Sequence, residues 1–291
     1  MDKAITAIVA PMKSGGSVDF ESFGRLLDFQ IKNGIKTLVV NGSTGEEKML
    51  GSRDKVRLLR MARKKAEIVI AGVGAVLTRD AVLNAKTARI CGANYALLTP
   101  SEYIKPTADG LLRHFAAVQS VMPTIVYDIK GRTGRQISDE EFVELMKMPN
   151  IVGVKAASGD MCQIARVIKM ANRSEKFQHK RIFVWSGDDN LTTAVRDAGG
   201  DGVISVVSNL APKDVRILCE SDDKDEVAAA AARIAPLIKA AFAENNPAGI
   251  KRMLFAAGLI ADDRASDEIG RLTIANAALC DEAAKQYMAA R

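Results

Sequence analysis

The sequence predicts a (β/α)8 TIM barrel with a C-terminal helical appendix. Eight short β-branched runs recur at roughly 30-residue spacing, and a segment with helical periodicity follows each of them. Strands that alternate with helices form right-handed βαβ units and a parallel sheet, and eight such units close into a barrel. After about residue 222 the strands stop and the chain becomes Ala-rich. We therefore expect a barrel domain over residues 1–222 and a helical domain over residues 223–291.

The predicted strands are short and almost wholly apolar, as expected for strands that are buried on both faces. In chain order they cover residues 4–10, 37–40, 68–71, 95–98, 124–127, 151–154, 182–185 and 203–206. A doubly wound open sheet is the alternative. It is disfavoured because the first strand-to-helix turn, residues 11–16, has no G-x-G-x-x-G pattern, and no P-loop pattern occurs in the sequence.

Helix signals separate the predicted strands. Segment 20–31 carries apolar residues at helical spacing and ends before Gly34, a residue suited to a left-handed C-cap. Ser138 and Glu141 form a capping-box pattern before an apolar run. In the appendix, helical patterns cover residues 226–243, 247–259 and 267–291. We interpret them as a satellite domain packed on the barrel, with an oligomer contact as a further use.

The amino-acid composition and net charge indicate which kinds of molecule the protein binds. With 48% hydrophobic and 26% charged residues in 291, the chain resembles an ordinary soluble globular protein. A net charge of +6 favours anionic partners. The basic residues are scattered and only 5% of residues are aromatic, so we expect a small anionic substrate and no nucleic acid. The sequence shows neither a signal-peptide pattern nor a membrane-spanning apolar stretch, which predicts a cytoplasmic protein without membrane contact.

The residues that usually bind metals are dispersed. Four cysteines lie more than fifty residues apart from one another, so no zinc-ligand spacing exists. The two histidines, His114 and His179, fall on a predicted helix and in a polar loop, away from every strand end. We therefore expect no metal and no Ser-His-Asp arrangement, which leaves Lys, Tyr and hydroxyl groups for any chemistry.

Candidate reactive residues follow the predicted strands, where barrel enzymes place their active sites. Ser43 and Thr44 lie between glycines after the second strand, where backbone N–H groups and hydroxyls suit an anion, although such residues also simply stabilise turns. Tyr103 follows the fourth strand. Arg132, in a glycine-flanked turn after the fifth strand, suits a carboxylate or is a surface charge.

Lys155 is the most informative single residue, because it ends the apolar sixth strand and would project into the barrel mouth. Its amine must lose a proton before it attacks a carbonyl, and burial or a nearby cation favours that loss. Tyr127 ends the neighbouring strand and could pass protons during imine formation. The alternatives are a structural lysine paired with a carboxylate such as Asp160, and a core tyrosine.

These residues belong to motifs that resemble one family. The motifs are Gly-Ser-Thr-Gly-Glu at 42–46, Tyr103 with Lys105-Pro106, Tyr127 with Gly-Arg-Thr-Gly at 131–134, Val-Gly-Val-Lys at 152–155 with Ser-Gly-Asp at 158–160, Ser-Gly-Asp-Asp at 186–189, Gly-Val-Ile-Ser at 202–205, and Asn246-Pro247 with Ile250-Lys251. Their order and spacing resemble the dihydrodipicolinate synthase family, within the pyruvate-dependent class I aldolase and N-acetylneuraminate lyase superfamily. The similarity extends over nearly the whole chain.

The resemblance implies a role for each matching residue. Lys155 would form a Schiff base with pyruvate, and Thr44 with neighbouring backbone amides would hold the pyruvate carboxylate. Ser43, Tyr127 and Tyr103 match the proton relay of the family, in which the tyrosine equivalent to Tyr103 reaches across from a neighbouring subunit.

Three further residues match the substrate pocket of the family. Arg132 matches the residue that receives the carboxylate of aspartate semialdehyde, and Gly187 and Ile204 match backbone positions that line the pocket. The implied activity is that of a lyase that condenses pyruvate with L-aspartate-4-semialdehyde to give 4-hydroxy-tetrahydrodipicolinate, in lysine and diaminopimelate biosynthesis, without cofactor. The implied assembly is a homotetramer built from dimers.

Two other functions stay open at this point. Ser43 is more typical of N-acetylneuraminate lyase, so another Schiff-base pyruvate lyase, such as a 2-keto-3-deoxy sugar acid aldolase or dehydratase, is the alternative enzyme. Arg132 argues for the synthase, since a neutral sugar aldehyde offers no carboxylate for a guanidinium to bind. A barrel protein that has lost its activity is the remaining hypothesis.

The sequence also departs from the family pattern. Asp128 and Lys130 replace the usual Asn and Pro, and Ala156 replaces a usual Glu, which puts the second substrate in doubt more than the Schiff base. The lysine-inhibited members of the family carry polar and histidine groups where this sequence has Glu47, Lys48, Ser52, Lys55 and Val76. We therefore predict that L-lysine does not inhibit the enzyme; clear inhibition at millimolar lysine in a steady-state assay would contradict this.

Overall fold

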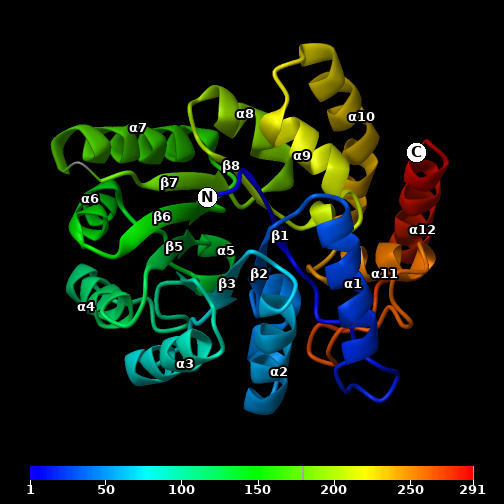
Figure 1. Ribbon diagram of the computed structural model, residues 1–291, viewed down its shortest axis with the longest axis horizontal. Helices are drawn as coiled ribbons and strands as arrows, with labels where there is room; N and C mark the ends of the chain where they lie inside the picture. Colours follow the sequence, from blue (N-terminus) through cyan, green and yellow to red (C-terminus); the bar gives the residue numbers. More distant parts are fainter. Residues whose placement is uncertain (179, 291) are drawn as a thin grey trace. The chain divides into compact units, whose positions relative to one another are not determined.

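Eight strands form a closed barrel in the computed structural model, which describes residues 1–178 and 180–290 (Figure 1). Its strands follow one another in chain order from β1 to β8. Every strand pair with a described register is parallel. This is the arrangement that helical crossovers between successive strands produce. The predicted (β/α)8 barrel is therefore confirmed.

The strands agree closely with the predicted runs. They are β1 Ala4–Ala7, β2 Thr37–Val40, β3 Ile68–Gly72, β4 Tyr95–Leu98, β5 Thr124–Asp128, β6 Ile151–Ala156, β7 Phe183–Ser186 and β8 Gly202–Ser205. The main difference is at β1, which is three residues shorter than the predicted run. Of the residues that follow it, Ile8 still donates its N–H to the carbonyl of Val39 at 3.0 Å.

Helices connect these strands and form the appendix. They are α1 Phe20–Lys32, α2 Ser52–Arg63, α3 Thr78–Ile90, α4 Ala108–Gln119, α5 Lys130–Thr133, α6 Asp139–Lys147, α7 Met161–Gln178, α8 Thr192–Asp197, α9 Pro212–Glu220, α10 Lys224–Ala241, α11 Ala248–Ala256 and α12 Ile274–Ala289. Short 3-10 turns, η1 Ser43–Gly45, η2 Glu47–Met49, η3 Asp189–Leu191 and η4 Val207–Asn209, follow the ends of β2, β7 and β8.

Local sequence signals explain several helix ends. The capping box at the start of α6 is formed: the Ser138 hydroxyl accepts the N–H of Glu141, and the Glu141 carboxylate accepts the N–H of Ser138 at 2.9 Å. Gly34, after α1, has a φ of +87°, the left-handed conformation that its position suggested. The last helix, α12, begins later than residue 267, because the segment before it makes contacts of its own that are described below.

The described chain falls into two compact units. One contains Met1 and Val69–Ile204, and the other contains Asp2–Ile68 and the chain from Ser205 onward. The first unit carries β4 to β7, and the second carries β1, β2 and the appendix helices α10 to α12. Within the second unit, α10, α11 and α12 contact one another, and α10 also contacts α9. The functional division predicted between residues 222 and 223 stays a prediction.

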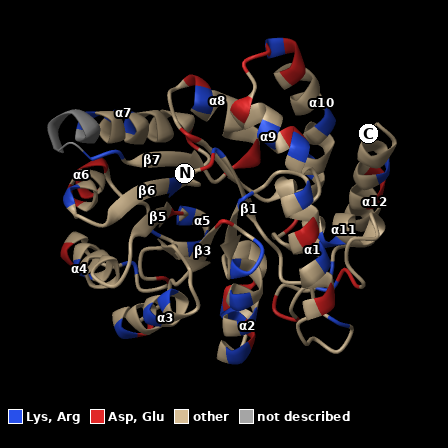
Figure 2. Cartoon of the chain, viewed as in Figure 1, with Lys and Arg blue, Asp and Glu red and all other residues tan. Residues whose placement is uncertain are grey.

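Charge is concentrated on the helices and loops, and the strands are almost entirely uncharged (Figure 2). On the helices, residues of both signs occur together, as on α1, where the salt bridge between Arg25 and Glu21 spans one turn at 2.9 Å. The strands are instead buried on both faces, with side chains such as Ile5, Leu38 and Ile125 fully enclosed. A charged group within a strand is therefore an exception that needs a physical reason.

Candidate active site

Two charged residues occur in the strands that the structure describes, Asp128 on β5 and Lys155 on β6. Both lie near the C-terminal end of their strands, and both are buried, with exposed fractions of 1% and 4%. Burying a charge is costly unless it is paired or used. Buried charges at the C-terminal ends of barrel strands are typical of an active site.

Lys155 and Tyr127 lie side by side on neighbouring strands. They are register partners in the pairing of β5 with β6, so their side chains project from the same face of the sheet. The Lys155 Nζ lies 4.3 Å from the centre of the Tyr127 ring, within the range of a cation–π contact. The structure thus brings together the two residues that the sequence proposed as nucleophile and proton carrier.

Gly187 leaves room for the Lys155 side chain. A Cβ atom at position 187 would lie 3.1 Å from Lys155 Cε and 2.5 Å from Ala157 Cβ, so a larger residue cannot fit without movement. The Gly187 N–H also donates to the carbonyl of Ala156 at 2.6 Å, which joins the end of β7 to the end of β6. Ile204, the other predicted pocket position, lies one residue before the end of β8 and is fully buried.

Asp188 provides a negative charge near Lys155. Burial raises the pKa of this carboxyl, while the hydrogen bond from the Gly159 N–H, at 3.1 Å, and the charge of Lys155 lower it. The sequence analysis quoted Asp188 only as part of a motif and assigned it no role. Asp160, the partner suggested there for Lys155, instead accepts the N–H of Cys162 at 2.9 Å at the start of α7.

Asp128 faces the other side of the sheet. Its carboxylate accepts the N–H of Ile137 at 3.3 Å and the amide of Gln163 at 3.0 Å. Burial raises its pKa to about 6, although these two hydrogen bonds and the charge of Arg135 oppose the rise. Successive residues of a strand alternate between faces, so Asp128 points away from the Tyr127 and Lys155 pair. Its carboxylate therefore anchors the segment that follows β5.

That segment carries Arg132. It lies on the four-residue helix α5, is exposed, and donates its backbone N–H to the carbonyl of Ile129 at 3.0 Å. The hydroxyl of Thr133 donates to the same carbonyl at 3.1 Å and braces the turn. The helix ends at Gly134 in the left-handed conformation, with a φ of +70°. Arg132 is thus presented from a braced turn immediately after the strand of Tyr127.

Tyr103 is placed differently from the other predicted site residues. It lies in the loop between β4 and α4 with a φ of +69°, and 87% of its surface is exposed. Positive φ values are unfavourable for a bulky side chain and usually indicate a functional constraint. Ile104 beside it is also exposed, and the neighbouring Ser101 hydroxyl donates to the carbonyl of Val76. The structure therefore does not bring Tyr103 into the buried pair of Tyr127 and Lys155.

Ser43 and Thr44 lie on η1 in the second unit, in a stretch that we call the 43–46 turn. Thr44 is buried and Ser43 is half-buried. The turn is compact because Gly45 and Glu46 donate their N–H groups back to Gly42 and Ser43 at 3.0 and 3.1 Å. Thr44 accepts a hydrogen bond from the side chain of Asn246, which lies 202 residues further along the chain, at 3.0 Å.

Metal ligands, membrane-spanning helices and histidines are the other features that could indicate a function. Among the described residues, no group of three or more His, Cys, Asp or Glu side chains could hold a metal ion, and no helix is long and apolar enough to cross a membrane. His114 is buried on α4, with Nδ1 3.0 Å from the Thr78 hydroxyl, and His179 lies outside the described residues.

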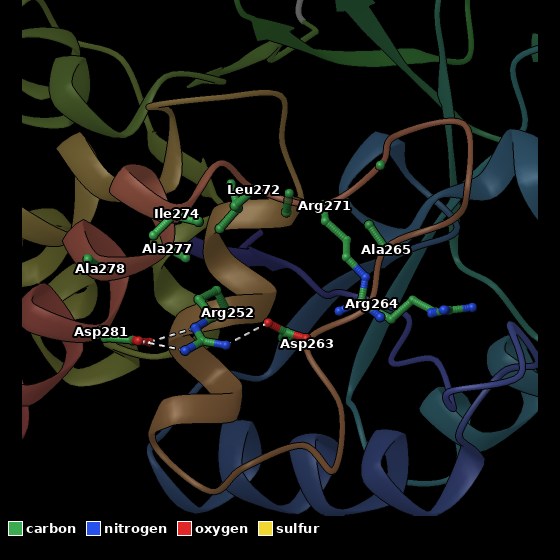
Figure 3. A pocket seen from close by; sticks show the side chains of 12 residues that line it. Arg252, Asp263, Arg264, Ala265, Arg271, Leu272, Ile274, Ala277, Ala278 and Asp281 are labelled. Atoms are coloured by element: carbon green, nitrogen blue, oxygen red, sulfur yellow. Dashed lines mark hydrogen bonds and ion pairs between the residues drawn. The ribbon is translucent and has the colours of Figure 1, made fainter.

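A cavity of about 370 Å³ opens in the second unit around Arg252, Asp263, Arg271 and Asp281 (Figure 3). None of the predicted site residues lines it. Arg252 lines this cavity and already has hydrogen-bond partners. It donates to Asp281 at 2.6 and 2.7 Å and to Asp263 at 2.9 Å. Arg252 is therefore engaged in ion pairs with α12 and with the segment before Arg264.

Three residues that contact or support the predicted site were not predicted from the sequence: Asp188, Asn246 and Lys251. Each stood in a motif, but none carried a local signal of its role. Asp188 looks like an ordinary loop carboxylate, and Asn246 and Lys251 are separated from their partners by about 200 residues. Long-range partners of this kind become visible only in the folded chain.

Comparisons with known proteins find curated relatives that align with most of this chain. The chain is 35% identical over 262 residues, 87% of this chain and 88% of the other, to a 4-hydroxy-tetrahydrodipicolinate synthase of Bacillus velezensis. It is 36% identical over 265 residues, 88% of each chain, to one of Pseudomonas aeruginosa.

Solved structures of dihydrodipicolinate synthases are also similar to this chain. The dihydrodipicolinate synthase of Thermotoga maritima superposes with a TM-score of 0.92, at 32% identity over 99% of both chains. The chloride-inhibited enzyme of Acinetobacter baumannii, complexed with pyruvate, gives a TM-score of 0.91 at 33% identity over 99% of both chains. The model of the dihydrodipicolinate synthetase family matches residues 1–275, and the chain belongs to this family.

Proposed function

We propose that this protein is a lyase that condenses pyruvate with L-aspartate-4-semialdehyde to form 4-hydroxy-tetrahydrodipicolinate. The observation that carries the proposal is the buried Lys155 amine beside the Tyr127 ring at the C-terminal end of adjacent strands. The names of the relatives, and the complex of the Acinetobacter baumannii enzyme with pyruvate, support this choice of substrates.

The proposed chemistry begins at Lys155. Its neutral amine attacks the ketone carbon of pyruvate, water leaves, and a protonated imine forms. Loss of a proton from the pyruvate methyl group then gives an enamine, whose carbon attacks the aldehyde of the second substrate. Tyr127 carries protons in these steps, and Asp188 offsets the positive charge of the imine.

Other residues bind the two substrates in this proposal. The hydroxyl of Thr44 and the backbone amides beside it hold the pyruvate carboxylate, and Ser43 joins the proton relay. Gly187 and Ile204 line the pocket with backbone groups. Arg132 binds the carboxylate of the semialdehyde, because a guanidinium offers two parallel N–H donors and keeps its charge. Asp128, which departs from the family pattern, binds Ile137 and Gln163 on the other face of its strand, which supports this choice of second substrate.

We also propose that the protein acts as a homotetramer built from dimers, located in the cytoplasm. In the dimer, Tyr103 would reach into the site of the neighbouring subunit and complete the proton relay. The exposed Tyr103 and Ile104, together with exposed Val76 and Leu77 on an adjoining loop, support a partner surface at this place. We call these four residues the apolar cluster.

Borohydride reduction in the presence of pyruvate tests the function. We expect peptide mass spectrometry to locate an adduct on Lys155 with the mass of pyruvic acid less one oxygen atom, and we expect none in Lys155→Ala. Absence of an adduct on folded protein would refute the Schiff base and favour a non-enzymatic barrel.

Product assays then identify the second substrate. Turnover of pyruvate with aspartate semialdehyde, but not with N-acetylmannosamine, is the expected result, and the reverse would identify a sugar-acid lyase. Arg132→Ala should raise the KM for the semialdehyde much more than the KM for pyruvate, because it removes a contact to one substrate only. Equal changes in both values would contradict the role of Arg132.

A further inference from the structure

Asn246 determines which hydrogen bonds the Thr44 hydroxyl can make. The Asn246 side-chain amide donates to Thr44 Oγ at 3.0 Å. A hydroxyl has one proton to donate and two lone pairs that accept, and Asn246 occupies one lone pair. Among the residues that the structure describes, none accepts the Thr44 proton in a hydrogen bond. Thr44 is only 3% exposed, so water does not easily replace Asn246.

This arrangement suits an anionic ligand. A carboxylate can only accept hydrogen bonds, so Thr44 must present its proton to bind one. A donor on the far side of the hydroxyl leaves the proton free to turn toward the ligand. An acceptor in the place of Asn246 would bind that proton and turn a lone pair toward the ligand instead. The chemistry of residue 246 therefore decides whether Thr44 attracts or repels a carboxylate.

A buried ion pair holds the same turn in place. Glu46 directly follows η1 in the left-handed conformation, with a φ of +54°, and pairs with Lys251 of α11; both side chains are fully buried. Glu46 also accepts the N–H of Ser266 at 2.6 Å, and Lys251 donates to the carbonyl of Arg264 at 3.0 Å. The 43–46 turn is thus tied to both α11 and the segment that follows it.

A second layer supports that segment. Arg252, the neighbour of Lys251, binds Asp263 and Asp281, and so joins the segment before Arg264 to α12 (Figure 3). Hydrogen bonds and charge from these two carboxylates raise the pKa of Arg252 above its ordinary value. The appendix therefore contacts the 43–46 turn through groups that are themselves fixed.

We propose that Asn246 is a positioning residue that makes the Thr44 hydroxyl a hydrogen-bond donor to the carboxylate of pyruvate, and that the appendix thereby sets the affinity for pyruvate. This inference rests on the proposed function, because it requires that Thr44 binds the carboxylate. Asn246 does not touch the reacting atoms. It acts through Thr44, so its effect belongs in the binding of pyruvate and not in the later carbon–carbon bond formation.

Asn246→Asp is the sharpest test, because it keeps the shape of the side chain and replaces a donor with an anionic acceptor. We expect the pyruvate concentration that gives half-maximal borohydride trapping to rise at least tenfold. The KM for the semialdehyde and the kcat at saturating pyruvate should change less than twofold. Asn246→Ala, which removes the donor without adding charge, should raise the same pyruvate concentration about threefold and serves if the aspartate variant does not fold.

A matched control separates the contact from the added charge. Asn245→Asp introduces the same charge one residue away, at an exposed position, and should leave pyruvate trapping within twofold of the parent. In a Thr44→Val background, Asn246→Asp should add less than a twofold effect, because the hydroxyl through which it acts is gone.

The outcomes distinguish the inference from the function on which it rests. Parent protein that traps pyruvate while both Asn246 variants trap it with unchanged concentration dependence would overturn the inference and leave the proposed function standing. A full effect of Asn246→Asp in the Thr44→Val background would also overturn it. Parent protein that traps no pyruvate would overturn both.

Discussion

At the scale of single residues, the adjacent strands β5 and β6 each carry one buried charged residue, and the two residues have different roles. Lys155 and Tyr127 project from one face, and Asp128 projects from the other, since side chains alternate along a strand. A one-residue displacement of β5 would exchange Tyr127 for Asp128 beside the lysine. The register of β5 against β6 therefore decides which group accompanies Lys155.

Asp128 should make stability depend on pH. Burial raises its pKa from 3.8 to about 6. Because the folded chain binds this proton more tightly than the unfolded chain, the contribution to stability is complete below pH 4 and is lost as the pH rises through 6. At about 1.4 kcal/mol per pKa unit, the loss is on the order of 3 kcal/mol.

Asp128→Asn should remove the contribution of this carboxyl to the pH dependence of stability. We expect the difference in free energy of unfolding between pH 4 and pH 7 to shift by about 2–3 kcal/mol in favour of pH 7, relative to the parent. Urea unfolding of both proteins at the two pH values measures it. An identical pH dependence in parent and variant would show that Asp128 titrates as in the unfolded chain.

Gly187 should tolerate no side chain. A Cβ atom there meets Ala157 Cβ at 2.5 Å and Lys155 Cε at 3.1 Å. We expect Gly187→Ala to cost about 1–3 kcal/mol of stability and to lower the rate of pyruvate trapping at least tenfold, since Lys155 must shift. Thermal unfolding and trapping kinetics measure the two effects. Gly15→Ala, with nothing within 4 Å of the added atom, is the control and should leave both unchanged.

At the scale of elements, local signals predicted the regular parts well. The strands, the capping box of α6 and the helices α10 and α11 lie close to their predicted positions. The prediction was less accurate for the last helix, since α12 begins at Ile274 rather than residue 267. The chain before it forms irregular structure with a turn at residues 267–269, and Arg264 and Ser266 use backbone groups to bind Lys251 and Glu46. Tertiary hydrogen bonds override helical propensity there.

The Glu46 and Lys251 pair should be important for stability. Removing one partner of a buried pair leaves an uncompensated charge and typically costs about 3–5 kcal/mol. We expect Lys251→Met to lower the free energy of unfolding by about that amount, and Glu46→Gln combined with Lys251→Met to lower it less. For comparison, Arg25→Met removes an exposed pair with Glu21 and should cost under about 1 kcal/mol.

Urea unfolding of these variants measures the three effects. A Lys251→Met variant as stable as the parent would mean that the pair contributes no more than a surface salt bridge. A double variant less stable than Lys251→Met would show that the neutral glutamine is worse at this position than an unpaired carboxylate.

At the scale of the whole molecule, the proposed use of Tyr103 requires a second copy of the chain, which would also cover the exposed apolar cluster. Tyr103 is 87% exposed and cannot serve a buried lysine in the manner of Tyr127. We expect light scattering at micromolar concentration to give a dimer or larger assembly. Ile104→Asp should shift it toward the monomer and lower kcat at least tenfold, because a charge in an apolar interface is costly.

A control at another exposed apolar residue tests the location. Ile90→Asp, on α3 and outside the cluster, should leave the mass and the activity unchanged. A monomeric parent protein with full activity would exclude the shared site. Full activity of a Tyr103→Phe variant would show that the Tyr103 hydroxyl is not part of the proton relay. It would not contradict the dimer.

The sequence alone determined the barrel and the strand-end positions of Lys155, Tyr127, Arg132 and the 43–46 turn. These depend on periodicity and on the connection of each strand to the next, which are local properties of the chain. Only the tertiary structure decided that Asp128 faces away from Lys155, and that Asn246 and Lys251 hold Thr44 and Glu46. Those contacts join residues more than 200 positions apart, where packing selects the partners and no local pattern encodes them.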